Sequence, residues 1–190
     1  PSAIGEKMCE DARIPLVSAT GSTRVGRIVG TKVASRFGRS ILELGGNNAV
    51  IISQHADLPN VLPGLVFGSV GTAGQRCTST RRLIIHEDIY EDVKQKLVSA
   101  YKQLRIGDPL NENNHVGPLI DKTAVKDYMS AIEKVIAEGG KVLVPGGVLE
   151  GKGYESGCYV KPCIAEAKND FEIVQHETFA PILYIMKYKT

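Results

Sequence analysis

Apolar residues occur along the chain in short continuous runs that alternate with longer stretches of helical spacing. The short runs at 14–19, 41–44 and 82–86 are bounded by polar or turn residues and predict strands, of which the first is expected to be buried. The stretches 88–104 and 121–138 place their apolar residues on one face and predict amphipathic helices. Further strands are predicted at 49–52, 142–144, 159–164 and 181–186, and a further helix from Asp57. This alternation predicts an α/β fold with a largely parallel open sheet and flanking helices.

The first predicted helix follows directly on the first strand. Ser22 or Thr23 is its expected N-cap, because either hydroxyl can accept a hydrogen bond from the first turn. Apolar residues recur at helical spacing as far as Phe37, and Gly38 is the expected terminator.

Two adjacent glycines, Gly45 and Gly46, predict the one internal boundary of the chain, because glycine permits the backbone freedom of a hinge. The chain is therefore expected to consist of two units, 1–44 and 45–190.

Composition narrows the classes of protein that remain. The chain has 190 residues, a net charge of +2 and 43% apolar residues, which excludes intrinsic disorder. Lysine and arginine are scattered, so no nucleic-acid partner is expected. The uncharged stretch 58–75 is interrupted by prolines and glycines, so no membrane span is expected either. The chain begins at Pro1 and ends at Thr190 directly after an apolar run, and we expect it to be a piece of a larger protein.

The four cysteines contain no C-x-x-C pair, and the four histidines lie far apart. This spacing predicts neither a disulfide framework nor a metal site. The start of the chain carries no secretory signal, so a reduced, cytoplasmic location is expected.

The turn Thr20-Gly21-Ser22-Thr23 lies between a predicted strand and a predicted helix. Backbone N–H groups and the helix dipole at such a position can bind a phosphate. An ordinary capped turn explains the same residues, and on capping preference alone it is the favoured interpretation.

Glu43 is a carboxylate between two leucines at a predicted strand end. Burial would favour its protonated form and make it a candidate general base near neutral pH. A solvated glutamate at the edge of the sheet is the alternative.

Cys77 ends the segment Gly74-Gln75-Arg76-Cys77, where a substrate can approach the backbone closely. A neighbouring Arg76 or a helix N-terminus would favour the nucleophilic thiolate. The alternative is an inert thiol, which is the expectation for the other cysteines. A Cys–His hydrolase would need a distant histidine to fold back onto Cys77.

The segment 176–181 combines Glu177, Phe179 and a proline before a strand. Taken alone, it could be a turn whose phenylalanine packs in the core.

Together these four segments resemble the aldehyde dehydrogenase superfamily. The turn at Gly21, the Glu-Leu-Gly-Gly segment at Glu43, the Gly-x-x-Cys segment at Cys77 and the Glu-x-Phe segment at Glu177 occur in the family's order. Most members have glycine where this chain has Ala180, whereas the antiquitin branch, the α-aminoadipic semialdehyde dehydrogenases, has alanine. The segments that match this branch are 18–23, 43–49, 74–77 and 176–182.

The resemblance implies the end of a Rossmann-type NAD-binding domain, residues 1–44, joined to an incomplete catalytic domain, residues 45–190. It also implies NAD-dependent oxidation of an aldehyde, expected to be α-aminoadipic semialdehyde of lysine degradation, to the acid. Cys77 would be the nucleophile that forms a thiohemiacetal and then a thioester, and Glu43 would activate water for hydrolysis.

The resemblance further implies the contacts of cofactor and substrate. The implied NAD contacts are Gly21, Ser22, Val25, Leu44, Glu177 and Phe179. Arg76 would select a substrate that carries a carboxylate, because arginine pairs carboxylates bidentately, and Thr78 would line the same pocket. The full-length protein would be a homo-oligomer, a dimer or a tetramer, and the 190 residues alone are expected to turn over no substrate.

Two other functions fit the same residues. A CoA-acylating semialdehyde dehydrogenase can share the Gln-Arg-Cys segment but lacks a glutamate at the position of Glu43. A non-catalytic protein could retain the fold, although it would have no need for both Cys77 and Glu43.

Overall fold

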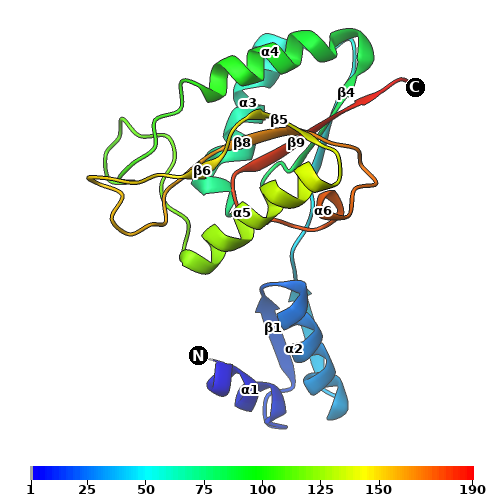
Figure 1. Cartoon of the computed structure of the whole chain (residues 1–190). Coiled ribbons are helices and arrows are strands. Elements are labelled where there is room, and N and C mark those ends of the chain that lie inside the picture. Colours follow the sequence, from blue (N-terminus) through cyan, green and yellow to red (C-terminus); the bar gives the residue numbers. More distant parts are fainter. Residues whose placement is uncertain (1) are drawn as a thin grey trace. The chain divides into compact units, whose positions relative to one another are not determined.

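The computed structural model describes residues 2–190, apart from the side chain of Ser2. The chain divides into two compact units, one that reaches to Gly46 and one that runs from Asn47 to Thr190. Each unit is a separate assembly of strands and helices (Figure 1).

The first unit contains two parallel strands and two helices. Its elements are α1 (Ser2–Glu10), β1 (Leu16–Thr20), α2 (Thr23–Ser35) and β2 (Arg39–Glu43). The strands β1 and β2 are parallel, with Val17 opposite Ser40. Helix α2 begins as expected, because the Ser22 hydroxyl accepts a hydrogen bond from the Val25 N–H at 3.3 Å. Helix α1 was not predicted.

The sequence predicted that the helix corresponding to α2 continues to Phe37, which is too far. Helix α2 ends at Ser35, and Phe37 takes a left-handed conformation with φ of 57°. Its side chain is 99% exposed. The spacing of apolar residues suggested a longer helix, but the chain has already turned toward β2 at this point.

The second unit contains a sheet of five strands in the order β3-β4-β9-β8-β5. The strands are β3 (Ala49–Ile52), β4 (Arg82–His86), β5 (Lys141–Val144), β8 (Cys163–Glu166) and β9 (Ile182–Tyr188). All neighbours in this sheet are parallel except β5, which runs antiparallel to β8. The expected α/β fold with a largely parallel sheet is confirmed.

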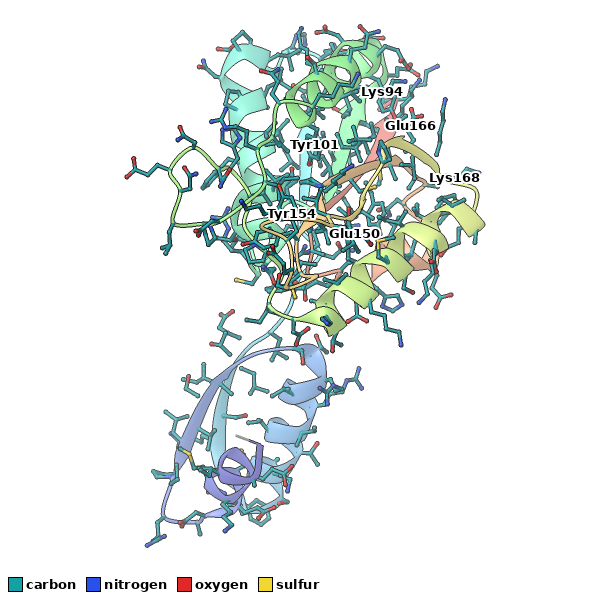
Figure 2. All side chains as sticks on the ribbon, turned by 60° about the vertical axis from the view of Figure 1, so that its left-hand side comes forward. Lys94, Tyr101, Glu150, Tyr154, Glu166 and Lys168 are labelled. Atoms are coloured by element: carbon teal, nitrogen blue, oxygen red, sulfur yellow. The ribbon has the colours of Figure 1, made fainter. Side chains whose placement is uncertain are left out.

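Helices flank this sheet on both sides. They are α3 (Leu58–Val70), α4 (Tyr90–Tyr101), α5 (Lys122–Ala137) and the short α6 (Glu172–Gln175), with a 3₁₀ turn at Glu87–Ile89. Figures 1 and 2 show α4 and α5 on opposite sides of the sheet. Within residues 2–190, none of the helices is long and apolar enough to cross a bilayer.

One predicted strand is divided in two by proline. The expected strand 159–164 is observed as β7 (Val160–Lys161) and β8, with Pro162 between them. Proline has no N–H to donate to a ladder, so the chain changes partners there. Strand β7 pairs antiparallel with β6 (Gly147–Val148).

The core of the second unit lies between the central strands and the helices. Leu83, Leu183 and Ile185 are fully buried, as are Val93 of α4 and Tyr128 of α5. A central parallel strand is covered on both faces, which explains why β9 begins with five consecutive buried residues.

A partly buried polar network joins α4 to β8. The Tyr90 hydroxyl donates to Glu166 Oε1 at 2.7 Å. Lys94 Nζ lies 3.4 Å from the same oxygen, and Lys94 and Glu166 approach one another in Figure 2. Burial, and after it the hydrogen bond to Glu166, raises the pKa of Tyr90, so its hydroxyl stays protonated and keeps donating.

Candidate functional site

The chain between α3 and β4 forms an irregular loop that exposes Cys77. We call residues 71–79 the thiol loop. Its first part is a 3₁₀ turn, Gly71–Gly74, in which Thr72, Ala73 and Gly74 all have positive φ, at 52°, 53° and 68°. Left-handed backbone costs a non-glycine residue about 1 kcal/mol or more, so this turn needs support from its surroundings.

Hydrogen bonds within the loop, and others from the Asn48 side chain, fix the part of the thiol loop that carries Cys77. The Ser79 N–H donates to the Arg76 carbonyl at 3.0 Å, and the Arg76 N–H donates to the Ser79 hydroxyl at 3.2 Å. The Asn48 side chain donates to the carbonyls of Cys77 at 2.5 Å and of Ser79 at 3.1 Å. The Cys77 thiol is exposed, and within residues 2–190 its backbone N–H donates to no acceptor.

The thiol loop packs directly against the segment before β9. A Cβ at Gly74 would collide with the carbonyl oxygen of Ala180, so only glycine allows this approach. We call residues 177–180 the Phe179 segment. Two of the four predicted signals, Cys77 and the pair Glu177 and Phe179, therefore lie on segments that touch each other.

The side chain of Arg76 is held against α3. Its guanidinium lies over the ring of Phe67, 4.7 Å from the centroid, and donates to the Phe67 carbonyl at 3.4 Å. Its Nε is buried without a partner among the described residues. Thr78, on the other side of Cys77, is exposed.

The Phe179 segment places a carboxylate and an aromatic ring beside a buried cation. Glu177 Oε1 lies 3.4 Å from Arg81 Nη2, and the Arg81 guanidinium is 5.3 Å from the centre of the Phe179 ring. Phe179 is 45% exposed, so it does not fill the core as the alternative interpretation required.

A hollow of about 550 Å³ borders both segments. It is lined by Thr72, Gln75, Pro118, Leu119, Ile120 and Phe179. Gln75 joins its two sides, because its amide donates to the Pro118 carbonyl at 3.1 Å and accepts from the Ile120 N–H at 2.8 Å. Sequence analysis missed residues 118–120, whose only signal is a proline shortly before the N-cap Asp121.

The other predicted residues gather in the first unit, where its two strands end. The Gly21 N–H donates to the Glu43 carbonyl at 3.0 Å, which joins the two strand ends. Ser22 and the 38% exposed Val25 lie at the start of α2. Glu43 is exposed at the end of β2, so the burial considered for it is absent from this unit.

Leu44 packs its side chain on α2. A Cβ on Gly26 would collide with the Leu44 side chain, so the helix and this residue touch closely. The predicted site residues thus form two groups. One group in the first unit comprises Gly21, Ser22, Val25, Glu43 and Leu44, and one in the second comprises Arg76, Cys77, Thr78, Glu177 and Phe179.

No histidine of residues 2–190 pairs with Cys77. The four rings have other contacts: His55 contacts Gln54, His86 contacts Asp88 and Tyr188, His115 contacts Arg105, and His176 contacts Glu172. The arrangement gives no support to a Cys–His hydrolase.

Sequence analysis also missed Arg81, which lies between the two segments of the second unit. Its guanidinium donates to the carbonyls of Gly74 at 3.1 Å, Thr178 at 2.7 Å and Arg76 at 3.1 Å. Burial lowers the pKa of Arg81, and nearby Glu177 opposes that shift. An arginine pair before a strand gave no sign that one member is buried.

Comparison with protein families gives one match, to the model described as "Aldehyde dehydrogenase family", over residues 1–190. The chain is 49% identical over 187 residues to the α-aminoadipic semialdehyde dehydrogenase of Bos taurus, covering 98% of this chain and 34% of that protein. It is 48% identical to a putative aldehyde dehydrogenase family 7 member A1 homolog of Caenorhabditis elegans, covering 98% and 35%. The chain therefore spans about a third of the length of the curated relatives it matches.

Solved structures show the same fold. A betaine aldehyde dehydrogenase from Staphylococcus aureus, in complex with NAD⁺, superposes with a TM-score of 0.94 at 26% identity, covering 98% of this chain and 37% of that one. A putative aldehyde dehydrogenase from Burkholderia cenocepacia also gives 0.94, at 30% identity, covering 98% and 38%.

Proposed function

Because the chain belongs to the aldehyde dehydrogenase family, we propose that it carries the reactive thiol of an NAD-dependent enzyme that oxidises α-aminoadipic semialdehyde to the acid. The observation that carries the proposal is the exposed Cys77 on a bonded loop that touches the Phe179 segment. The activity is proposed for the full-length protein that contains this chain, because the chain spans about a third of the length of its relatives. We assign residues 1–44 to an NAD-binding domain and 45–190 to the catalytic domain.

The residues present suit NAD. The Ser22 N–H, at the start of a 13-residue helix, suits a pyrophosphate, Gly21 beside it carries no side chain that would block the approach, and Val25 offers an apolar contact. In the other group, the Glu177 carboxylate can accept hydrogen bonds from ribose hydroxyls, and the exposed Phe179 ring borders a hollow of about 550 Å³. The backbone of Leu44 would offer a further contact. When bound, NAD⁺ supplies a hydride acceptor.

The chemistry of the first half-reaction belongs to Cys77. Its thiolate attacks the aldehyde carbon and forms a thiohemiacetal, and the Cys77 N–H is free to donate to the resulting oxyanion. Loss of hydride leaves a thioester on the same sulfur. Among the described residues, the guanidinium groups of Arg76 and Arg81 donate to carbonyl oxygens and to Glu177, and neither donates to the Cys77 sulfur.

The second half-reaction needs a base to activate water. Glu43 serves this purpose in our proposal, taking a proton from the water that attacks the thioester carbonyl and releases the acid. The exposure of its carboxylate in the first unit leaves it available for that contact.

Arg76 provides the selection for a substrate that carries a carboxylate. Stacking on Phe67 fixes the guanidinium plane. A fixed guanidinium is suited to a carboxylate, because the fork geometry allows two parallel hydrogen bonds. Thr78 would line the same pocket on the other side of Cys77.

The test is a product assay on the full-length protein that contains this chain. We expect NADH and free α-aminoadipic acid from the semialdehyde, a lower rate with simple aliphatic aldehydes, and no product from Cys77→Ala. Release of acyl-CoA when CoA is added, or activity that survives Cys77→Ala, would contradict the proposal. The 190-residue chain alone is expected to be inactive.

A further inference from the structure

The most deeply buried charge in the second unit is used by none of the steps above. Arg81 is 1% exposed and lies directly before β4. Its guanidinium donates to the Gly74 and Arg76 carbonyls in the thiol loop, and to Thr178 and Glu177 in the Phe179 segment. One side chain therefore holds both segments, which are about 100 positions apart in the sequence.

Stability alone does not explain this burial. Taking a guanidinium out of water is unfavourable unless it is well paired. Here the one carboxylate, of Glu177, is 3.4 Å away, and Arg81 Nε has no partner within the described residues. An apolar side chain of similar volume would avoid this cost, so the reason for an arginine lies in what its donors hold.

The groups that it holds are the parts of the site with the least regular backbone. The Gly74 carbonyl follows two non-glycine residues in left-handed conformation, Thr72 and Ala73. The Phe179 segment contains neither helix nor strand, and its aromatic ring lies over the same guanidinium. Strained and irregular backbone keeps one conformation only where its surroundings fix it.

We propose that Arg81 is a positioning residue that locks the thiol loop to the Phe179 segment and so fixes Cys77 relative to Glu177 and Phe179. The inference rests on the proposed function, since it assigns the first segment to the nucleophile and the second to the cofactor. The fork of the guanidinium is essential to this role, because Nη1 donates to Gly74 and Thr178 while Nη2 reaches Arg76 and Glu177, and a single ammonium nitrogen cannot occupy both of these places.

The experiment compares Arg81→Lys and Arg81→Met with Val135→Ala in the full-length protein. Val135 is fully buried in α5 and is distant in sequence from both segments, so its variant serves as a control for lost stability. Steady-state kinetics with NAD⁺ and α-aminoadipic semialdehyde give kcat and the KM for NAD⁺. Amide hydrogen exchange of the peptides covering 71–79 and 177–180 reports the order of the two segments.

We expect kcat to fall about tenfold or more and the KM for NAD⁺ to rise about fivefold in Arg81→Lys, although it retains the charge. Exchange should accelerate in both peptides together, whereas Val135→Ala should leave kinetics and both peptides unchanged. In a cycle with Glu177→Gln, the effects on the KM for NAD⁺ should be non-additive.

Three results would overturn the inference: kinetics of Arg81→Lys equal to those of Val135→Ala, faster exchange in only one peptide, or failure of both Arg81 variants to fold. Failure of both variants to fold would show that Arg81 serves only the stability of the core. If the unmodified protein oxidises no aldehyde, the proposed function fails, and hydrogen exchange alone still decides whether Arg81 couples the two segments.

Discussion

The parallel strands of the two units have very different surroundings. In the first unit, β1 alternates between exposed and half-buried residues, β2 is exposed at every position except Leu42, and Ile41 is 55% exposed. In the second unit, β9 is buried from Ile182 through Met186. An apolar run therefore predicts that a strand forms, while its burial depends on which elements cover it.

The same contrast applies to the two groups of site residues. The thiol loop is bonded to Asn48, Pro118 and Arg81. The turn at Ser22 has one side-chain cap, and Glu43 has an exposed carboxylate. The following predictions test both sides of this comparison.

The largest effect is expected at Glu43 in the first unit. Glu43→Gln keeps the shape of the side chain but cannot take a proton from water, so turnover should fall about 100- to 10,000-fold. The first burst of NADH should remain, because thioester formation needs the thiol and NAD⁺ but not the Glu43 carboxylate. Stopped-flow absorbance measures both. Glu6→Gln, an exposed change in α1, is the control, and loss of the burst together with turnover would show that Glu43 acts earlier.

The next prediction compares the stability contributed by one strand residue in each of the two sheets. Leu183→Ala in β9 should lower the free energy of unfolding by about 3 kcal/mol, because a buried side chain leaves a cavity. Ile41→Ala in β2 should cost less than about 0.5 kcal/mol in the first unit, since its side chain is already half in water. Urea unfolding measures the difference, and equal losses would mean that Ile41 is covered in solution.

A smaller effect is expected from one methyl group in the thiol loop. Gly74→Ala should destabilise the protein by about 2 kcal/mol, since φ is +68° there and the Cβ would collide with Ala180. Gly64→Ala, in α3 with open space around it, should be neutral or stabilising by up to about 1 kcal/mol. Thermal unfolding measures the midpoint temperatures of the two variants, and similar midpoints would contradict the close approach at Gly74.

The smallest effect is expected at the turn of the first unit. Ser22→Ala removes the N-cap hydrogen bond of α2 and should cost about 1 kcal/mol. Thr23→Ala should cost less, because Thr23 is the first helical residue and does not cap. Hydrogen exchange across the first turn of α2 measures both, and a larger effect at Thr23 would reverse the assignment of the cap.

Local signals in the sequence predicted most elements of the fold. The periodicity of 121–138 located α5, whose N-cap Asp121 accepts from the Ala124 N–H at 2.8 Å. The run 82–86 coincides with β4. Helix α1 was missed because its residues carry no clear periodicity, and Phe37 was misplaced because spacing alone does not show where a helix ends.

The site was less accessible to sequence reasoning, since its contacts join distant segments. The signals around Cys77 and Phe179 were visible as short motifs. The role of Arg81 depends on the Thr178 carbonyl, which folds next to it from nearly 100 positions away. The contribution of Pro118 and Ile120 likewise depends on the Gln75 side chain, and no local pattern encodes either contact.

The most direct test of the proposed chemistry is to trap the thioester. Glu43→Gln protein is mixed with NAD⁺ and α-aminoadipic semialdehyde, quenched in acid, digested and analysed by peptide mass spectrometry. We predict an aminoadipoyl group on the peptide that contains Cys77 and on no peptide that contains Cys9, Cys158 or Cys163. An acyl group on another cysteine, or NADH formed without any acylated peptide, would contradict the assignment of Cys77 as the nucleophile.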